Sequence, residues 1–287
     1  MPNPFSDYVR AFPGLLRCAR AADMRAAAAA PMAPALLSAP VCLIFSPHPD
    51  DEAIAGALPW RLRSQNGWRV VNVAVTLGSN HTRRAARWQE AQACCDYLSF
   101  ELCSASGETQ IGMERITPAT ERSEPGHWAA SVQKIAAVLL QYQPRVIVCP
   151  HADDGHPVHV GTHFLVHCAL GQIGSALLPH VLLSEYWNTQ GKPGLMVELG
   201  VPEVTRLVSA LSLHVGEVAR NPYHLTLPVC FMDAVRRGSE RVGAAGAPGA
   251  GFDFAALYGW TRWNGSHCVA QPTRLLPLTS SPAAFFV

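Results

Sequence analysis

The sequence predicts an α/β protein in which a mainly parallel sheet carries helices on both of its faces. Three observations predict this class. Runs of strand length, apolar or rich in β-branched residues, alternate with segments of helix length. The first run, Val41 to Ser46, is largely apolar, as a strand buried on both faces is. Polar clusters directly follow two of the runs, where ligands bind in sheets of this kind.

The expected elements follow one another in a regular rhythm through the middle of the chain. Asn66-Gly67 is a typical stop for the first helix, inside which Pro59 can introduce a kink, and Pro144 ends the third. Right-handed crossovers between parallel strands then give a Rossmann-like three-layer fold. We predict strands at 41–46, 69–76, 100–103, 145–149 and 181–186, helices at 52–65, 81–98, 127–142, 158–170 and 202–215, and loops at 104–124 and 238–251.

The length allows one large domain or two small ones, and the lack of an internal repeat or a clear linker favours a single domain that spans residues 1–287. Hydrophobic residues make up 49% of the chain, which is enough for a sizeable core. Within the domain we expect a core over 41–225. An N-terminal extension over 1–38, either one or two short helices or a loosely ordered arm, precedes it, and a C-terminal extension over 226–287 follows.

Charge balance and cysteine content narrow the partners and the compartment. Lys and Arg number 22 against 21 Asp and Glu, without the basic excess that nucleic-acid binding needs. No apolar run approaches the about 20 residues that span a membrane, and the N-terminus lacks a signal-peptide layout. Nine cysteines without a CxxC pair indicate buried, reduced thiols. We expect a cytoplasmic protein with neither nucleic acid nor membrane as a partner, and a homo-oligomer is left open.

Two polar clusters carry the candidate chemistry. Pro47-His48-Pro49-Asp50-Asp51-Glu52 ends the first strand, and a segment from Pro150 to His159 follows the fourth. In the common strand order these strands are neighbours, so the clusters face each other across one crevice. Mixed histidine and carboxylate ligands with one open position suit a catalytic Zn²⁺ ion. A further carboxylate can then act as a base, and a further histidine can stabilise an oxyanion or protonate a leaving group.

The same residues resemble a known family. Pro47 to Glu52 resembles the signature of the LmbE-like, or PIG-L, zinc-dependent N-deacetylases, which act on N-acetylglucosaminyl compounds. A second family element, His-Pro-Asp-His, is similar to His156-Pro157-Val158-His159, and a third, Arg-x-x-Glu, is similar to Arg87-Trp88-Gln89-Glu90. The resemblance covers roughly residues 41–225. It implies a hydrolase that removes acetyl from an N-acetylated sugar or glycoside and releases acetate and a free amine.

The resemblance also implies roles for individual residues. His48, Asp51 and His159 would bind Zn²⁺, with Fe²⁺ or another divalent ion as the alternative, and Asp50 would deprotonate the attacking water. His156 would stabilise the tetrahedral intermediate and assist departure of the amine. Val158 departs from the family pattern, because an acidic residue there would normally support His156. Asp153 and Asp154 are near enough in sequence to replace it.

Substrate contacts are expected from several segments. We predict Arg87 (or the nearby Arg83 or Arg84), Asp154, His214 and Tyr223 as substrate-binding residues, the last two from a polar segment over 214–224. His163 and His167 continue the helical spacing of His159, and either could rival it as a ligand or pack against the helix's neighbours. Two alternative functions stay open, an amidase that acts on another conjugate and a metal-binding protein without catalysis.

Overall fold

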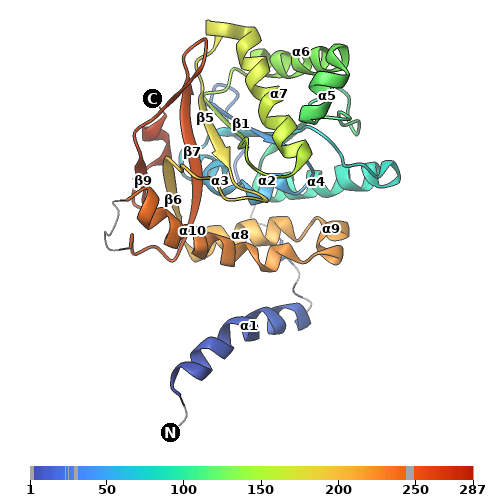
Figure 1. The fold of residues 1–287 in the computed structure, drawn as a ribbon. Helices are drawn as coiled ribbons and strands as arrows, with labels where there is room; N and C mark the ends of the chain where they lie inside the picture. The colour runs from blue at the N-terminus through green and yellow to red at the C-terminus, as the bar shows by residue number, and fades with distance from the viewer. Residues whose placement is uncertain (1–2, 23, 25, 29–31, 244–248, 287) are drawn as a thin grey trace.

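The computed structural model describes residues 3–22, 24, 26–28, 32–243 and 249–286, and they form three layers around one sheet (Figure 1). The strand order is β3-β2-β1-β4-β5-β7-β6-β9, with β8 paired to β7. The predicted α/β fold with a mainly parallel sheet is confirmed. The strands are β1 (Val41–Ser46), β2 (Arg69–Ala74), β3 (Glu101–Ser104), β4 (Val146–Pro150), β5 (His180–Ser184), β6 (Leu195–Leu199), β7 (Phe254–Trp263), β8 (Cys268–Ala270) and β9 (Arg274–Leu276).

The parallel half of the sheet explains why its strands are apolar on both faces. β1 lies between β2 and β4, and every one of its residues is buried. Cys42 and Ile44 point into one half of the core, whereas Leu43 and Phe45 point into the other. Successive side chains of a strand alternate between the faces, so a strand covered on both sides needs apolar residues at every position.

Helices from different parts of the chain cover the two faces. Along the two core halves, α3, α4 and α8 pack on the Ile44 side, and α6 and α7 pack on the Leu43 side. No helix in the described residues is long and apolar enough to cross a membrane. The helices are α1 (Phe5–Ala21), α2 (Asp51–Ile54), α3 (Ala57–Asn66), α4 (Arg84–Leu98), α5 (Pro118–Ser123), α6 (Pro125–Tyr142), α7 (Pro157–Ile173), α8 (Val201–Leu211), α9 (Val215–Arg220) and α10 (Leu227–Arg241), with short 3-10 turns at His81–Arg83, Gly174–Ala176, Tyr223–Leu225 and Pro282–Phe285.

The antiparallel half of the sheet comes from chain beyond residue 190, where no strand was predicted. β7 lies between β5 and β6 and runs antiparallel to both, so the last part of the chain supplies an inner strand of the sheet. Tyr258 of β7 ties this strand to the helices next to β1. Its hydroxyl donates to the Ala55 carbonyl at 2.8 Å and accepts from the Leu58 amide at 3.2 Å.

The predicted helix over 52–65 is two helices, α2 and α3, separated at Ala55-Gly56. Pro59 accounts for the restart. A proline inside a continuous helix removes a backbone donor, whereas in the first turn of α3 its missing N–H would have no helical partner. Gly56 also lies where a Cβ would approach the Glu52 carbonyl and a Leu207 methyl of α8 at 2.8 Å each. The break therefore lets α8 pack closely over α2.

Three further predictions of secondary structure need correction. The loop predicted over 104–124 ends in α5, and the helix predicted over 202–215 is α8 followed by a separate α9. The loop predicted over 238–251 begins with the last turn of α10, and its residues 244–248 lie outside the described part of the chain. Among the described residues of the predicted N-terminal extension there is one helix, α1, which has no buried residue and extends away from the three layers (Figure 1).

Acid should destabilise the metal-free protein through His163, which is 9% exposed on the inner side of α7. Burial, with nearby His167, lowers the pKa of His163 from 6.5 to about 4. Since protonation is favoured in the unfolded chain, stability is fully present above pH 6.5 and falls as the pH drops towards 4, by about 3 kcal/mol. Urea unfolding of wild type and His163→Gln at several pH values measures this. If the two lose stability in parallel between pH 6.5 and 4, His163 is not the cause.

Candidate active site

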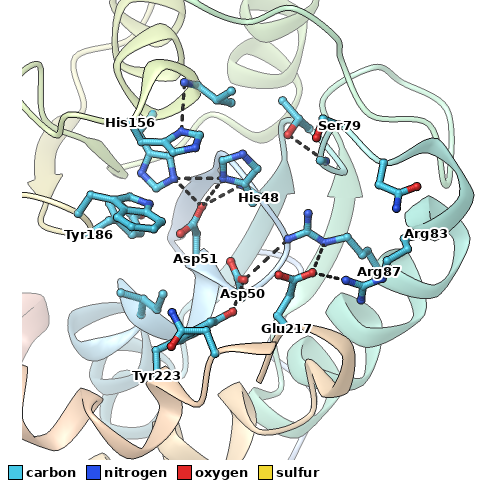
Figure 2. Close-up of a pocket in the computed structure, with 18 of the residues that line it drawn as sticks. His48, Asp50, Asp51, Ser79, Arg83, Arg87, His156, Tyr186, Glu217 and Tyr223 are labelled. Carbon is cyan, nitrogen blue, oxygen red and sulfur yellow. Dashed lines mark hydrogen bonds and ion pairs between the residues drawn. The ribbon is translucent and has the colours of Figure 1, made fainter. Parts of the chain in front are cut away.

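The main cleft lies at the carboxyl ends of β1 and β4, where the two predicted polar clusters meet. It has a volume of about 940 Å³. Its lining includes His48, Asp50, Asp51, His156 and His159 from those clusters. In a doubly wound sheet the chain leaves β1 and β4 on opposite sides, and this divergence opens the crevice. Figure 2 shows side chains from both clusters pointing into the same space.

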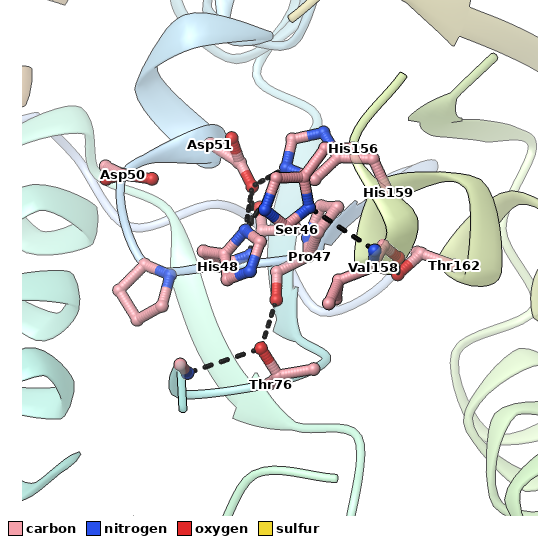
Figure 3. Close-up of polar contacts among 12 residues, drawn as sticks. Ser46, Pro47, His48, Asp50, Asp51, Thr76, His156, Val158, His159 and Thr162 are labelled. Carbon is pink, nitrogen blue, oxygen red and sulfur yellow. Dashed lines mark hydrogen bonds and ion pairs between the residues drawn. The ribbon is translucent and has the colours of Figure 1, made fainter. Parts of the chain in front are cut away.

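Three ligand atoms converge at the centre of the cleft (Figure 3). His48 Nδ1 lies 3.1 Å from His159 Nε2, and Asp51 Oδ2 lies 3.5 Å from the former and 3.4 Å from the latter. Atoms bound to one Zn²⁺ through bonds of about 2.0–2.2 Å are separated by similar distances. The three predicted metal-binding residues are thus together, and their spacing and chemistry fit a divalent cation.

Charge on this triad is arranged to keep Asp51 ionised. Burial raises the pKa of Asp51, but His159 and His48 more than offset it, so the pKa lies below its ordinary value. The Asp51 carboxylate also accepts a hydrogen bond from the His48 amide at 2.9 Å. Burial lowers the pKa of His159, but the carboxylates of Asp51 and Asp154 raise it by more. The pKa of His159 therefore lies above its ordinary value. A bound cation would balance the negative charge of Asp51, which a proton on His159 would otherwise balance.

Asp154 holds His159 from behind. Its Oδ1 lies 3.1 Å from His159 Nδ1, on the side of the ring away from His48. Its Oδ2 accepts a hydrogen bond from the Trp187 amide at 3.2 Å. A carboxylate on the second nitrogen of a metal-binding histidine fixes the tautomer and the orientation of the ring. Asp154 is 0% exposed and does not line the cleft, which corrects its prediction as a substrate contact.

Asp50 occupies the position beside the triad. It has a φ of 116°, which is on the left-handed side for a residue with a side chain, and it precedes α2. Its carboxylate accepts a hydrogen bond from the Tyr223 hydroxyl and lies 3.8 Å from the Arg87 guanidinium. Burial and the charge of Asp51 raise the pKa of Asp50 to about 7, although His214, Tyr223 and Arg87 act in the opposite direction.

A buried ion pair supports Asp50 from below. Glu52 Oε2 accepts the backbone N–H of Asp50 at 3.0 Å, and Glu52 Oε1 lies 2.8 Å from His214 Nε2. Both side chains of the pair are 0% exposed. Burial lowers the pKa of His214, but Glu52 more than compensates, so the net shift is upward. His214 therefore contacts Glu52 and not the cleft, which corrects its prediction as a substrate-binding residue.

His156 lines the cleft opposite Asp50, where α7 begins. Its Nδ1 accepts a hydrogen bond from the Val158 amide at 3.3 Å, so its side chain caps the helix. Burial, together with His48 and His159, lowers the pKa of His156. A ligand atom of His156 also lies within 4.8 Å of those of His48 and His159, which makes it a rival to Asp51. We favour Asp51 because its oxygen is at most 3.5 Å from both histidine nitrogens.

An arginine-rich wall faces the triad. Arg87 donates to the Pro49 carbonyl at 3.1 Å, and its Nε lies 3.6 Å from Glu217. Arg83 donates to Glu217 at 2.6 Å, and Arg220 does so at 2.5 Å. Burial raises the pKa of Glu217, but these three arginines more than offset it, so Glu217 stays ionised. Arg87 and Tyr223, which were predicted to bind substrate, both line the cleft. Arg87 donates to the Pro49 carbonyl next to Asp50, and Tyr223 donates to the Asp50 carboxylate.

Two further parts of the wall come from loops that follow β3 and β5. Glu114 and Arg115 line the cleft from within the segment predicted as a loop, and Arg84 binds Glu114 at 2.6 Å. Trp187 is 69% exposed and stacks on His156 with a centroid separation of 5.8 Å. Isolated charged or aromatic residues in loops carry no periodic signal. Of these residues, Trp187 is the one close to a strand end, since it follows β5 by three residues.

The fold and the cleft define a Rossmann-like α/β protein with a set of two histidines and one aspartate at the switch point of its sheet. Residues 43–170 match the sequence model of the PIG-L family, described as GlcNAc-PI de-N-acetylase. The predicted resemblance to the LmbE-like, or PIG-L, family is confirmed over this segment, which is less than half of the chain and contains the three predicted metal ligands.

Individual relatives agree with this family. The chain is 28% identical over 177 residues to the 1D-myo-inositol 2-acetamido-2-deoxy-alpha-D-glucopyranoside deacetylase of Mycobacterium leprae, over 54% of this chain. It spans 56% of the length of that relative.

Two solved structures share the fold at low identity. N,N'-diacetylchitobiose deacetylase from Pyrococcus horikoshii has a TM-score of 0.55 and 16% identity, and the match covers 95% of this chain and 97% of that one. The 4-carboxy-2-hydroxymuconate hydratase GalB from Pseudomonas putida has a TM-score of 0.57 and 15% identity, covering 77% of this chain and 95% of that one. One fold thus serves two kinds of reaction, and the assignment of a reaction depends on the site.

Proposed function

We propose that this protein is a metal-dependent N-deacetylase that hydrolyses the acetamide of a small N-acetylated sugar or glycoside to acetate and a free amine. The observation that carries the proposal is the triad of His48, Asp51 and His159, with the carboxylate of Asp50 next to it and outside it. The family match and the named activities of the Mycobacterium leprae and Pyrococcus horikoshii relatives support it.

His48, Asp51 and His159 would hold the metal, and Asp154 would orient His159. We propose Zn²⁺, with Fe²⁺ as the alternative that the same ligand types accept. When bound, the ion would supply a Lewis acid that polarises the acetamide carbonyl and lowers the pKa of water. The remaining steps fall to residues of the chain.

Asp50 would accept a proton from the attacking water. Its pKa of about 7 lies near neutral pH, where a general base is most effective. The Glu52 carboxylate holds the Asp50 backbone, and the Tyr223 hydroxyl fixes one oxygen of its carboxylate. The other oxygen would accept the proton. These contacts hold Asp50 in place beside the metal triad.

His156 would act on the other side of the scissile bond, as a donor to the oxyanion or to the departing amine. Because its Nδ1 accepts from the Val158 amide, its remaining nitrogen Nε2 carries the proton in the neutral ring. A neutral imidazole can donate a hydrogen bond to an oxyanion. Trp187, stacked on His156 and 69% exposed, offers an aromatic face on which a sugar ring can lie.

Acetate release tests the proposal. The metal-loaded protein is incubated with N-acetylglucosamine, N,N'-diacetylchitobiose and the inositol glycoside named for the Mycobacterium leprae relative, and acetate and free amine are quantified. We expect both products in equal amounts and their loss after treatment with a chelator, with recovery on addition of Zn²⁺ or Fe²⁺. Equal activity before and after complete metal removal would exclude the metal-dependent mechanism.

Val158 gives one reason to keep a second candidate, a metal-binding protein without catalysis. The family has a carboxylate at this position to support His156, and valine cannot supply one. Asp154 contacts His159 instead of replacing that carboxylate. Stoichiometric metal binding without turnover on the deacetylation panel or on a panel of other amide conjugates would support this candidate. Turnover only on the second panel would favour the amidase.

Loss of the Asp154 carboxylate should weaken metal binding. We expect Asp154→Asn to raise the dissociation constant for Zn²⁺ about 10–100-fold, because His159 loses the partner that orients its ring. Competition with a chelating dye measures the constant. Asp153→Asn is the matched control, since Asp153 is exposed on the same loop. Equal affinity of the two variants would show that Asp154 does not act through the metal site.

Tyr223→Phe should move the acid limb of the activity profile to higher pH. The Tyr223 hydroxyl stabilises ionised Asp50, so its removal raises the pKa of that carboxyl and leaves less of the base deprotonated at low pH. The profile of kcat/KM against pH measures the shift. A downward shift or an unchanged limb would contradict the role of Asp50 as the base.

A further inference from the structure

A second cluster of potential metal ligands lies beneath the active site, between β4 and α7. It consists of Cys149 on β4 and of His163 and His167 on α7, whose ligand atoms all lie within 4.8 Å of one another. Cys149 is 0% exposed and His163 is 9% exposed, while His167 is partly exposed. His159, His163 and His167 follow at intervals of four residues, so they share one face of α7.

Backbone carbonyls fix the tautomers of both histidines. His163 Nδ1 lies 2.9 Å from the Pro150 carbonyl oxygen, and His167 Nδ1 lies 2.8 Å from the His163 carbonyl oxygen. A carbonyl only accepts, so each Nδ1 carries the hydrogen and each Nε2 of the neutral ring has a free lone pair. An N–H donated to a carbonyl from the second nitrogen is the usual support of a metal-binding histidine.

The surroundings keep the two imidazoles neutral. Burial lowers the pKa of both rings, and their centroids are only 4.1 Å apart, which disfavours a positive charge on either. Two neutral imidazoles and a thiol are thus held together in the form that metals bind, apart from the thiol proton. In the described part of the chain, the second nitrogen of each ring has no hydrogen-bond partner, which leaves its lone pair available to a metal.

We propose that Cys149, His163 and His167 form a second metal site, which takes a thiophilic cation such as Zn²⁺ and ties α7 to β4. Binding would exchange the Cys149 thiol proton for the metal, so one proton is released and a thiolate–metal bond forms. Soft thiolate and imidazole ligands distinguish this site from the triad of His48, Asp51 and His159, which contains no sulfur. Because the site lies between β4 and α7, a bound metal would stiffen the two elements that carry the second polar cluster.

Cobalt titration separates the two sites without any measurement of activity. Co²⁺ is added to the reduced, metal-free protein in the absence of air, and absorption is followed in the near ultraviolet, where thiolate-to-cobalt charge transfer occurs. We expect this band in wild type and in His48→Ala, which removes a ligand of the proposed catalytic site only. Failure of the proposed deacetylase activity would leave the band unchanged.

Cys149→Ser should abolish the band, whereas Cys42→Ser should retain it. Cys42 is a matched control, because its thiol is equally buried on the neighbouring β1 but faces the other half of the core. His167→Gln changes a partly exposed residue and tests the site if Cys149→Ser fails to fold. Loss of a residue that only supports a metal ligand lowers metal affinity about 10–100-fold. Because His167 would be a ligand itself, His167→Gln should raise the dissociation constant for Co²⁺ by more than that. Absence of the band from wild type, or its persistence with unchanged affinity in Cys149→Ser or His167→Gln, would overturn the proposal.

Discussion

Asp50→Asn is expected to lower kcat about 10²–10⁴-fold, the contribution that a positioned general base makes. Asparagine has the same shape and tolerates positive φ, so the backbone at φ 116° can persist. Its amide cannot accept a proton from water. Because Asp50 lies outside the triad, metal content should stay at the wild-type level. Steady-state kinetics on the best acetamide substrate, with metal analysis of the same samples, measures both quantities.

Asp153→Asn is the control for this experiment. Asp153 is an exposed carboxylate on the loop that follows β4, and its substitution should leave kcat close to that of wild type. A rate for Asp50→Asn within a few-fold of wild type would remove Asp50 from the role of base. Loss of metal from Asp50→Asn would instead make Asp50 a ligand and call for a revised triad.

Glu52→Ala is expected to destabilise the protein by about 3–5 kcal/mol, the usual cost of removing one partner from a buried pair. The change leaves His214 without its counter-charge in a site that is 0% exposed. It also removes the acceptor of the Asp50 amide. The loss therefore affects both stability and the conformation of the base. Denaturant unfolding of the metal-free protein measures the free energy.

Two further variants serve as controls for the Glu52→Ala experiment. Glu101→Ala removes an ion pair with Arg69 at 2.7 Å, but Glu101 is 46% exposed, so we expect at most about 1 kcal/mol. Glu52→Gln keeps an amide oxygen that can accept one of the two hydrogen bonds, so its loss should be intermediate. Equal losses for Glu52→Ala and Glu101→Ala would mean that burial adds nothing to the Glu52–His214 pair.

The polar motifs were predictable because their residues are close in sequence. His48, Asp50 and Asp51 follow one apolar strand within four positions, and His156 and His159 follow another. The rules of parallel sheets bring such strand ends together. The family relationship, the parallel half of the sheet and the meeting of the two clusters therefore followed from local patterns.

Contacts between distant segments were not predictable in the same way. Asp154 was expected at the substrate or beside His156, but the turn after β4 directs its carboxylate behind His159. His214 was expected at the cleft, but the packing of α8 over α2 buries it against Glu52. The strand β7 has ten residues of mixed character, and only its pairing with β5 and β6 defines it.

The sequence by itself determined which residue types the site contains and which two strand ends carry them, because these depend on periodicity and on short motifs. Only the tertiary structure decided which nitrogen and oxygen atoms converge, which carboxylate supports which histidine, and which residues are buried. Those features depend on the close packing of segments that are far apart in the sequence, such as Glu52 and His214, whose separation is 162 positions. Local preference contains no information about such contacts, and the balance of burial and charge at them sets the pKa of Asp50 and of its neighbours.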